Sequence, residues 1–153
     1  MAVVVSLHLA RKAERVNVRG SVGVRLVFAG DGSPAEQHVG FTVVNLGERP
    51  VNVASIGWCV GKRKSKRFCI QPVVGRYTQH YPRLLAYGEQ ASFLVSFQVA
   101  PNWTKEFAAG FVEDVSDKNL KTLRGMINFS VGQSIEIVPE ASLLERLRTV
   151  HAG

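Results

Sequence analysis

The sequence is poor in the features that mark several common protein classes. It has only two cysteines among 153 residues, too few for a disulfide scaffold, and its four histidines show no zinc-ligand spacing. No hydrophobic run approaches the ~18–20 residues needed to cross a bilayer. A nucleophile elbow, a phosphate-binding Gly-rich loop, a zinc-protease motif and a dinucleotide fingerprint are also missing. We therefore expect a protein that is not an enzyme and that binds no metal or cofactor.

The N-terminal segment, residues 1–12, lacks the marks of a secretion signal. Its apolar run is short, no basic residue precedes it, and His8 interrupts it. A signal peptide has a positively charged region first and a small-residue cleavage site after the apolar run. We expect no membrane partner and a cytoplasmic location.

Positive charge is concentrated in one short stretch. The chain has 19 Lys and Arg against 12 Asp and Glu, which gives a formal net charge of +7. Residues 61–67 read GKRKSKR and contribute five of these cations, so the remainder of the chain carries only +2. Charges this close together sum before salt screens them over ~8–10 Å. The pattern favours a specific acidic partner.

Apolar residues alternate with a period of two over much of the chain. The clearest run is 91–99, and similar runs begin at residues 22, 41, 51 and 127, whereas residues 35–38 read as part of a polar turn. β-branched and aromatic residues fill the runs, and turn sequences such as GDGSP and LGERP separate them. This spacing, in a chain with 46% hydrophobic residues, predicts a single all-β domain over residues 1–138.

One helix is predicted at the C-terminal end, over residues 139–150. Pro139 stands near its first turn, an acidic residue follows, and arginines come late, which matches the helix dipole. Leu143, Leu144 and Leu147 fall on one face of this helix. Two interpretations remain open: the leucines cap one end of the β domain, or they dock a partner or a second copy.

The order of turns and strands follows a recognisable pattern. An Asn-x-Gly-x-Arg-Pro turn joins two strands within residues 41–58, a Leu-x-x-Gly-Glu turn follows at 85–89, and a strand over 91–99 precedes a hairpin over 111–123. The first turn is formed by Asn45, Gly47, Arg49 and Pro50, and Asp117 lies near the tip of the last hairpin. In these parts, residues 22–131 resemble small immunoglobulin-like domains of bacterial and phage-encoded proteins. The resemblance implies an immunoglobulin-like antiparallel β-sandwich and brings no catalytic residue.

The two cysteines flank the basic stretch at equal distances from Lys64. Folding this segment as a hairpin about Lys64 places Cys59 and Cys69 directly opposite each other, with Cα atoms ~4.5–5.5 Å apart and within disulfide range. We therefore predict cross-strand neighbours, with residues 61–67 as the projecting tip. In a reducing cytosol both thiols are expected to be free, and a disulfide under oxidation is the alternative.

The basic tip itself has two interpretations. Clustered cations have to stay solvated, and lysines at a sheet edge block unwanted strand pairing. In the functional interpretation, which we favour, the tip contacts an acidic protein surface or the phosphates of a nucleoprotein complex. The candidate residues are Lys62, Arg63, Lys64, Lys66 and Arg67.

A second basic segment, residues 76–83, alternates aromatic and cationic side chains. Stacking of Tyr77 and Tyr81 on bases, with Arg76, His80 and Arg83 on phosphates, is the arrangement that single-strand binders use. The plainer interpretation packs both tyrosines against the β domain. Trp103 leaves a similar choice between packing at the rim of the core and serving as an exposed anchor for a partner.

The function we expect is that of a non-enzymatic protein-interaction module that presents residues 61–67 to an acidic partner surface. The resemblance implies a more specific version of this function, that of a phage-type inhibitor that docks on a nucleic-acid-processing complex. Direct nucleic-acid binding and a role as a structural or virion-associated subunit are the alternatives. The oligomeric state stays open.

Overall fold

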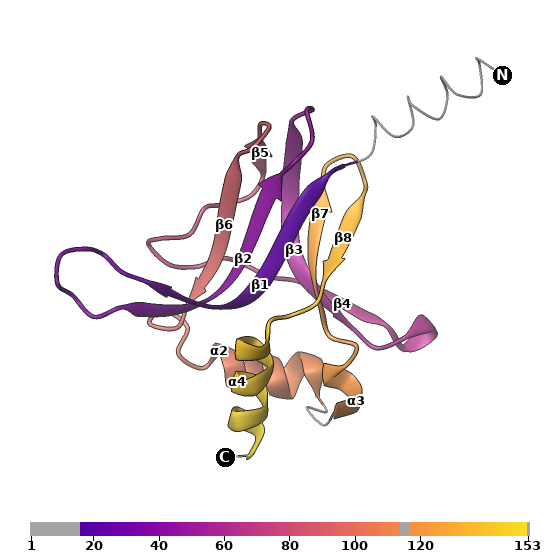
Figure 1. The fold of residues 1–153 in the computed structure, drawn as a ribbon. Helices are drawn as coiled ribbons and strands as arrows, with labels where there is room; N and C mark the ends of the chain where they lie inside the picture. Colours follow the sequence, from indigo (N-terminus) through magenta and orange to yellow (C-terminus); the bar gives the residue numbers. More distant parts are fainter. Residues whose placement is uncertain (1–15, 114–116, 153) are drawn as a thin grey trace.

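A computed structural model describes residues 16–113 and 117–152, and it folds them into two antiparallel sheets with helices at one end (Figure 1). The first sheet has the order β1-β2-β6, with β1 at Val18–Val27, β2 at Glu36–Asn45 and β6 at Gln90–Ser96. The second has the order β4-β3-β7-β8, with β4 at Arg67–Ile70, β3 at Val51–Val60, β7 at Arg124–Phe129 and β8 at Ser134–Ile137. A short strand, β5 (Arg83–Leu85), also pairs with β3. The N-terminal segment considered above lies outside the described residues.

Short helices gather at one end of the sheets (Figure 1). They are α2 (Trp103–Phe107), which continues into the π-helical turn η2 (Ala108–Val112), α3 (Asp117–Leu120) and the C-terminal α4 (Ala141–Ala152). A single 3₁₀ turn, η1 (Arg63–Ser65), stands apart between β3 and β4. Within the described ranges, none of these helices has the length and apolar character required to cross a membrane.

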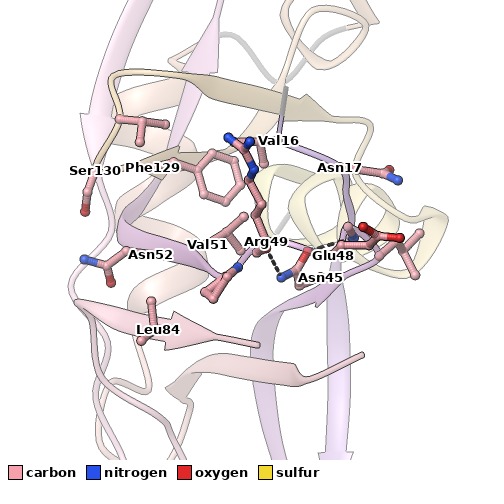
Figure 2. Close-up of a pocket in the computed structure, with 14 residues that line it drawn as sticks. Val16, Asn17, Asn45, Glu48, Arg49, Val51, Asn52, Leu84, Phe129 and Ser130 are labelled. Carbon is pink, nitrogen blue, oxygen red and sulfur yellow. Dashed lines mark hydrogen bonds between the residues drawn. The ribbon is translucent and has the colours of Figure 1, made fainter. Parts of the chain in front are cut away.

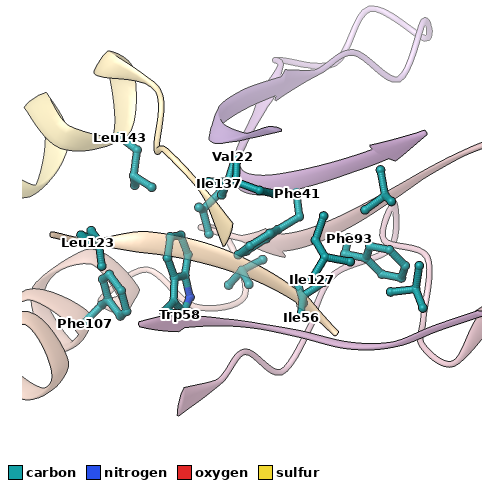
Figure 3. Packing of buried hydrophobic residues seen from close by; sticks show 14 of the residues in the cluster. Val22, Phe41, Ile56, Trp58, Phe93, Phe107, Leu123, Ile127, Ile137 and Leu143 are labelled. Atoms are coloured by element: carbon teal, nitrogen blue, oxygen red, sulfur yellow. The ribbon is translucent and has the colours of Figure 1, made fainter. Parts of the chain in front are cut away.

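The core forms where the apolar faces of the two sheets meet (Figure 3). Phe41 and Trp58, which come from opposite sheets, touch edge to face with ring centroids 4.8 Å apart. Alternation along the strands explains the burial, because successive side chains of a strand point to opposite faces. Each fully buried side chain of this size contributes about 1.5–3 kcal/mol through the hydrophobic effect.

Strand β3 changes the face that it buries partway along its length. Val51 and Val53 are buried at odd positions, whereas Ile56 and Trp58 are buried at even positions. The pairing of β3 with β7 shifts its register between Val53 and Ser55, which marks a β-bulge. Because a bulge inserts one extra residue, it allows both halves of β3 to face the core.

The C-terminal helix packs on the body of the protein. Leu143 and Leu147 are fully buried, which agrees with the capping interpretation. The Glu140 backbone N–H donates to the Val22 carbonyl at 2.9 Å, and the Glu140 carboxylate pairs with Arg25 at 2.6 Å. These contacts hold the start of the helix against β1.

Some predictions made from the sequence are wrong. Residues 36–38 belong to β2 and are not a turn, and the run predicted over 91–99 ends as a strand at Ser96. The prediction at β2 was wrong because polar residues were expected to be exposed. Glu36 and His38 are in fact buried, at 6% and 0% exposure. Strand β8 was not predicted.

The hairpin expected over residues 111–123 is also not formed. The chain there ends the π-helical turn η2 and then enters α3. Val112, Leu120 and Leu123 are buried, so the described parts of this segment pack at the helical end of the core and form no pair of strands.

Candidate functional site: the basic hairpin and its hollow

Strands β3 and β4 form the predicted hairpin, and residues 61–66 form its tip. The ladder runs from Gly57 opposite Ile70 to Val60 opposite Arg67. Gly61 opens the turn with φ of +93°, and a Cβ there would lie 2.7 Å from the Ser65 carbonyl oxygen. Only glycine fits this position without strain, since φ is positive and the backbone approaches closely.

The register corrects the prediction for the cysteines. Cys59 stands opposite Phe68, and Cys69 stands opposite Trp58. Directly paired residues share a face of the sheet, so the two cysteines lie on opposite faces and are not direct neighbours across the ladder. The prediction assumed a turn centred on Lys64. The pairing of Val60 with Arg67 instead centres the turn between Arg63 and Lys64, which shifts the register by one residue. Both thiols are free.

Two of the five cations within residues 61–67 are bound within the chain. The Lys66 ammonium contacts the Glu136 carboxylate on β8, and this contact lowers the pKa of the Glu136 carboxyl below its usual range. Arg67 pairs with Glu113 at 2.7 Å, and its guanidinium lies 5.9 Å from the centre of the Phe111 ring. These cations fasten the base of the hairpin to its neighbours.

The other three cations, Lys62, Arg63 and Lys64, are exposed. In the described part of the chain, no ion pair joins any of them to a carboxylate. The tip projects beyond the second sheet on the side where α3 lies (Figure 1). The hairpin therefore presents three positive charges to solvent at its end.

A hollow of about 760 Å³ lies between the tip and α3. Its volume falls within the ~300–1,000 Å³ typical of ligand pockets. Four cations and one carboxylate line it, and the remaining polar side chains come from both walls. The charged residues are Lys62, Arg67, Lys118, Lys121 and Glu113, and the neutral polar side chains are Ser65, Asn119 and Thr122.

Exposed apolar side chains stand beside the tip on β4. Phe68 is 60% exposed and Ile70 is 57% exposed. The two alternate with Cys69 along the strand, so they share the outer face of the sheet. The Lys66 ammonium lies 5.6 Å from the centre of the Phe68 ring, so the apolar surface directly adjoins the cations.

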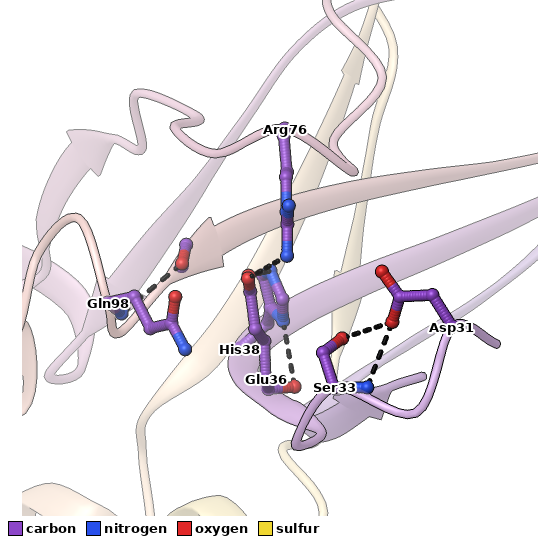
Figure 4. A network of polar contacts seen from close by, with 7 residues as sticks. Asp31, Ser33, Glu36, His38, Arg76 and Gln98 are labelled. Carbon is purple, nitrogen blue, oxygen red and sulfur yellow. Dashed lines mark hydrogen bonds and ion pairs between the residues drawn. The ribbon is translucent and has the colours of Figure 1, made fainter. Parts of the chain in front are cut away.

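The second basic segment lies along the other sheet and is not brought to the tip. Residues 74–79 run beside β6, where the Val74 N–H donates to the Leu94 carbonyl at 3.1 Å. Arg76 pairs with the buried Glu36 at 2.7 Å (Figure 4) and lies 4.8 Å from the centre of the Tyr77 ring. The Arg76 side chain therefore neutralises a buried carboxylate.

Both tyrosines of this segment make contacts with the body of the protein. The Tyr81 hydroxyl donates to the Gln71 carbonyl at 2.9 Å, and its ring packs on Phe93. Tyr77 meets the His38 ring edge to face. Arg83 is exposed on β5. A binding role for Arg76, Tyr77, Tyr81 and Arg83 stays a prediction.

A second hollow, of about 500 Å³, lies at the other end of the sheets (Figure 2). The turn at residues 45–50 forms one wall, and the fully buried Asn45 holds that turn together. Its side-chain amide donates to the Arg49 carbonyl at 2.9 Å and to the Leu85 carbonyl at 3.0 Å. Glu48 and Arg49 are the charged residues that line it in the described part of the chain, and their charges balance.

Comparisons with known proteins show only a distant likeness. No protein-family model matches the chain, and no curated protein matches it. A crystal structure described as that of an ApaA protein from Bordetella pertussis is 19% identical, with a TM-score of 0.36 over 80% of this chain and 87% of that one. Another structural-genomics crystal structure is 12% identical, with a TM-score of 0.33 over 80% of this chain and 82% of that one. Likeness at this level supports no inference about the present chain.

Two cations of the site, Lys118 and Lys121, were not predicted from the sequence. Lys118 lies in the stretch SDKN at residues 116–119, and both lysines lie within residues 111–123, which were predicted to form a hairpin. Their sequence distance from the tip conceals their position, because only the fold brings α3 beside residues 61–67. A local signal does exist: both lysines flank a single buried leucine, Leu120, as exposed residues of a short helix would.

Proposed function

We propose that this chain is a non-enzymatic protein-interaction module that presents the basic hairpin, residues 61–67, to an acidic surface of a partner protein. The observation that carries the proposal is the exposed group Lys62, Arg63 and Lys64, which forms no ion pair within the described chain. Unpaired charges of one sign raise the local potential and steer an oppositely charged partner.

The surface next to the tip favours a protein as the partner. Phe68 and Ile70 offer apolar contact area beside the cations. Interfaces between proteins combine apolar or aromatic anchors with a charged rim, whereas contacts to a phosphate backbone are mainly electrostatic. The tyrosines expected to stack on bases lie elsewhere and pack on the body, which weakens the nucleic-acid alternative.

The proposal includes an immunoglobulin-like arrangement of the two sheets and a cytoplasmic location. The antiparallel pairing and the opposed apolar faces are compatible with the first, and the free thiols with the second. An inhibitor that occupies a nucleic-acid groove fits this surface less well, because such a groove is itself basic and would repel the tip.

The experiment compares two triple variants with equal changes of charge. The tip variant is Lys62→Gln/Arg63→Gln/Lys64→Gln, and the control is Arg19→Gln/Arg49→Gln/Lys105→Gln, which alters exposed cations elsewhere. The probes are a glutamate-rich peptide and a single-stranded oligonucleotide of equal net charge. Binding is measured by fluorescence anisotropy at several salt concentrations.

We expect the tip variant to bind the peptide about tenfold more weakly, since each exposed ion pair contributes about 0.2–1 kcal/mol. The control variant keeps the parental affinity, and both variants keep the parental melting temperature. Equal losses in the two variants would show that net charge alone drives binding. Tighter binding of the oligonucleotide, with a slope of about −0.7 per phosphate in log affinity against log salt, would favour nucleic acid instead.

A further inference from the structure

The hollow beside the tip contains three lysines that no carboxylate neutralises in the described structure. They are Lys62 from the tip and Lys118 and Lys121 from the segment of α3. The carboxylate that shares the lining, Glu113, is 2.7 Å from Arg67 and is therefore already paired. An ammonium group has three donors and no acceptor, so these side chains require an anion or water.

Hydrogen bonds hold the walls of this hollow together. The Gly61 N–H donates to the Thr122 hydroxyl at 3.0 Å, which ties the tip to the chain after α3. That hydroxyl in turn donates to the Asn119 carbonyl at 3.0 Å, and the Asn119 side-chain amide donates to the Val112 carbonyl at 2.8 Å. The backbone that carries the three lysines is thus organised before any ligand arrives, which lowers the cost of binding.

We propose that this hollow binds a phosphate monoester carried by the partner protein, as phosphoserine or phosphothreonine within an acidic segment. A phosphomonoester carries about −1.5 to −2 charge and three acceptor oxygens, whereas a carboxylate carries one charge and two oxygens. Three ammonium groups around one hollow match the larger anion better. The inference rests on the proposed function, because the acidic segment that reaches the tip also delivers the phosphate.

A protein-borne phosphate suits this site better than a nucleic-acid backbone. Among the described residues, no aromatic side chain lines the hollow, so they offer no surface on which a base could stack.

The test uses three synthetic peptides of one glutamate-rich sequence, with phosphoserine, glutamate or serine at the central position. Inorganic phosphate and a short single-stranded oligonucleotide serve as further probes. Lys118→Gln/Lys121→Gln removes two charges from the hollow, and Arg63→Gln/Lys64→Gln removes two from the part of the tip that does not line it. All four residues are exposed, so both variants should fold.

We expect the full chain to bind the phosphoserine peptide at least tenfold more tightly than the glutamate peptide. The Lys118→Gln/Lys121→Gln variant loses this preference, whereas Arg63→Gln/Lys64→Gln weakens both peptides equally and keeps the preference. In ¹⁵N spectra of the parent, the phosphoserine peptide shifts the amide signals of Gly61 and Thr122 more than the glutamate peptide does.

The remaining outcomes overturn the proposal. They are equal binding of the phosphoserine and glutamate peptides, and a preference that survives in Lys118→Gln/Lys121→Gln. Inorganic phosphate that binds as tightly as the phosphopeptide would make the hollow a site for the free anion, and tighter binding of the oligonucleotide would assign it to nucleic acid. A different result would contradict the proposed function: an affinity for the glutamate peptide that stays unchanged when the tip charges are removed.

Discussion

Gln71 joins the only two tryptophans of the chain, and its replacement provides a quantitative test of the core. Its side-chain oxygen accepts the indole N–H of Trp58 at 2.9 Å and that of Trp103 at 3.1 Å. Gln71 is 7% exposed and Trp58 is fully buried, so water cannot replace this acceptor for Trp58. The interaction also shows that Trp103 packs at the rim of the core, as one of the two interpretations expected.

The substitution Gln71→Met keeps the length of the side chain and removes the acceptor. A buried donor left without a partner costs about 1–3 kcal/mol. The Trp58 N–H incurs this cost in full, whereas the half-buried Trp103 N–H gains some contact with water. We therefore expect Gln71→Met to lower the free energy of unfolding by about 2–4 kcal/mol.

Urea unfolding followed by tryptophan fluorescence measures this change, and a double-mutant cycle with Trp58→Phe isolates the hydrogen bond. In the Trp58→Phe background one donor is already gone, so Gln71→Met should cost about 1–2 kcal/mol less. Trp103 remains as the fluorescent reporter. A cost below about 1 kcal/mol for Gln71→Met, or equal costs in the two backgrounds, would refute the reasoning.

Three further predictions concern α4 and the base of the hairpin. Leu143→Ala should cost about 2–5 kcal/mol of unfolding free energy, and Leu144→Ala, at a half-buried position of the same helix, clearly less, when both are measured in urea. Burial and a 3.4 Å contact with the Glu136 carboxylate raise the pKa of the Cys59 thiol to about 11. In a Cys69→Ser background, Glu136→Gln should therefore move the pH profile of Cys59 alkylation to lower pH; an unmoved profile would show that Glu136 has no part in the shift. Because the pKa of the Glu136 carboxyl is lowered in the fold, its pairing stabilises above the unfolded pKa and is lost in acid, so the stability difference between parent and Glu136→Gln should shrink as pH falls through the folded pKa.

The strands with strict alternation could be predicted from the sequence, and the helical end could not. Phe41 and Val43 in β2 and Phe93 and Val95 in β6 are buried as the period of two requires. The segment 103–112 has no clear helical period, and its helix depends on tertiary packing. Phe107 stacks on Trp103 with ring centroids 4.7 Å apart, a contact that becomes visible only once the sheets are in place.

Polar residues account for the remaining errors in the predicted fold. Glu36 and His38 were assigned to a turn because buried charged residues are rare. The burial of Glu36 depends on Arg76, which lies 40 positions away in the sequence and neutralises its carboxylate. A sequence pattern that compares only neighbouring residues cannot reveal an ion pair between residues so far apart.

For the candidate site, the hairpin and its positive charge could be predicted from the sequence. Which cations form ion pairs within the chain and which stay exposed could not be predicted. Lys62 and Lys66 look alike in the sequence, yet Lys66 meets Glu136 from β8, a strand that the alternation did not reveal. The hollow was missed for the same reason, since its second wall comes from Glu113 and from side chains of residues 118–122. The chain topology determines which distant segments meet to form such a site. The alternation of apolar residues indicates only which face of a single strand is buried.

The distribution of ion pairs separates the charges that serve the fold from those that do not. Arg25, Arg67 and Arg76 each pair with a carboxylate at 2.6–2.7 Å, and each pair fastens one segment to another. Carboxylates are also present near the hairpin, but Glu113 and Glu136 contact the two cations at its base. The exposed cations at its end repel one another by up to about 1 kcal/mol per pair at 4 Å in water, and no described carboxylate offsets this. Under the proposed function, an acidic ligand supplies the missing negative charge and relieves this repulsion, so we expect the exposed tip cations to affect binding more than folding.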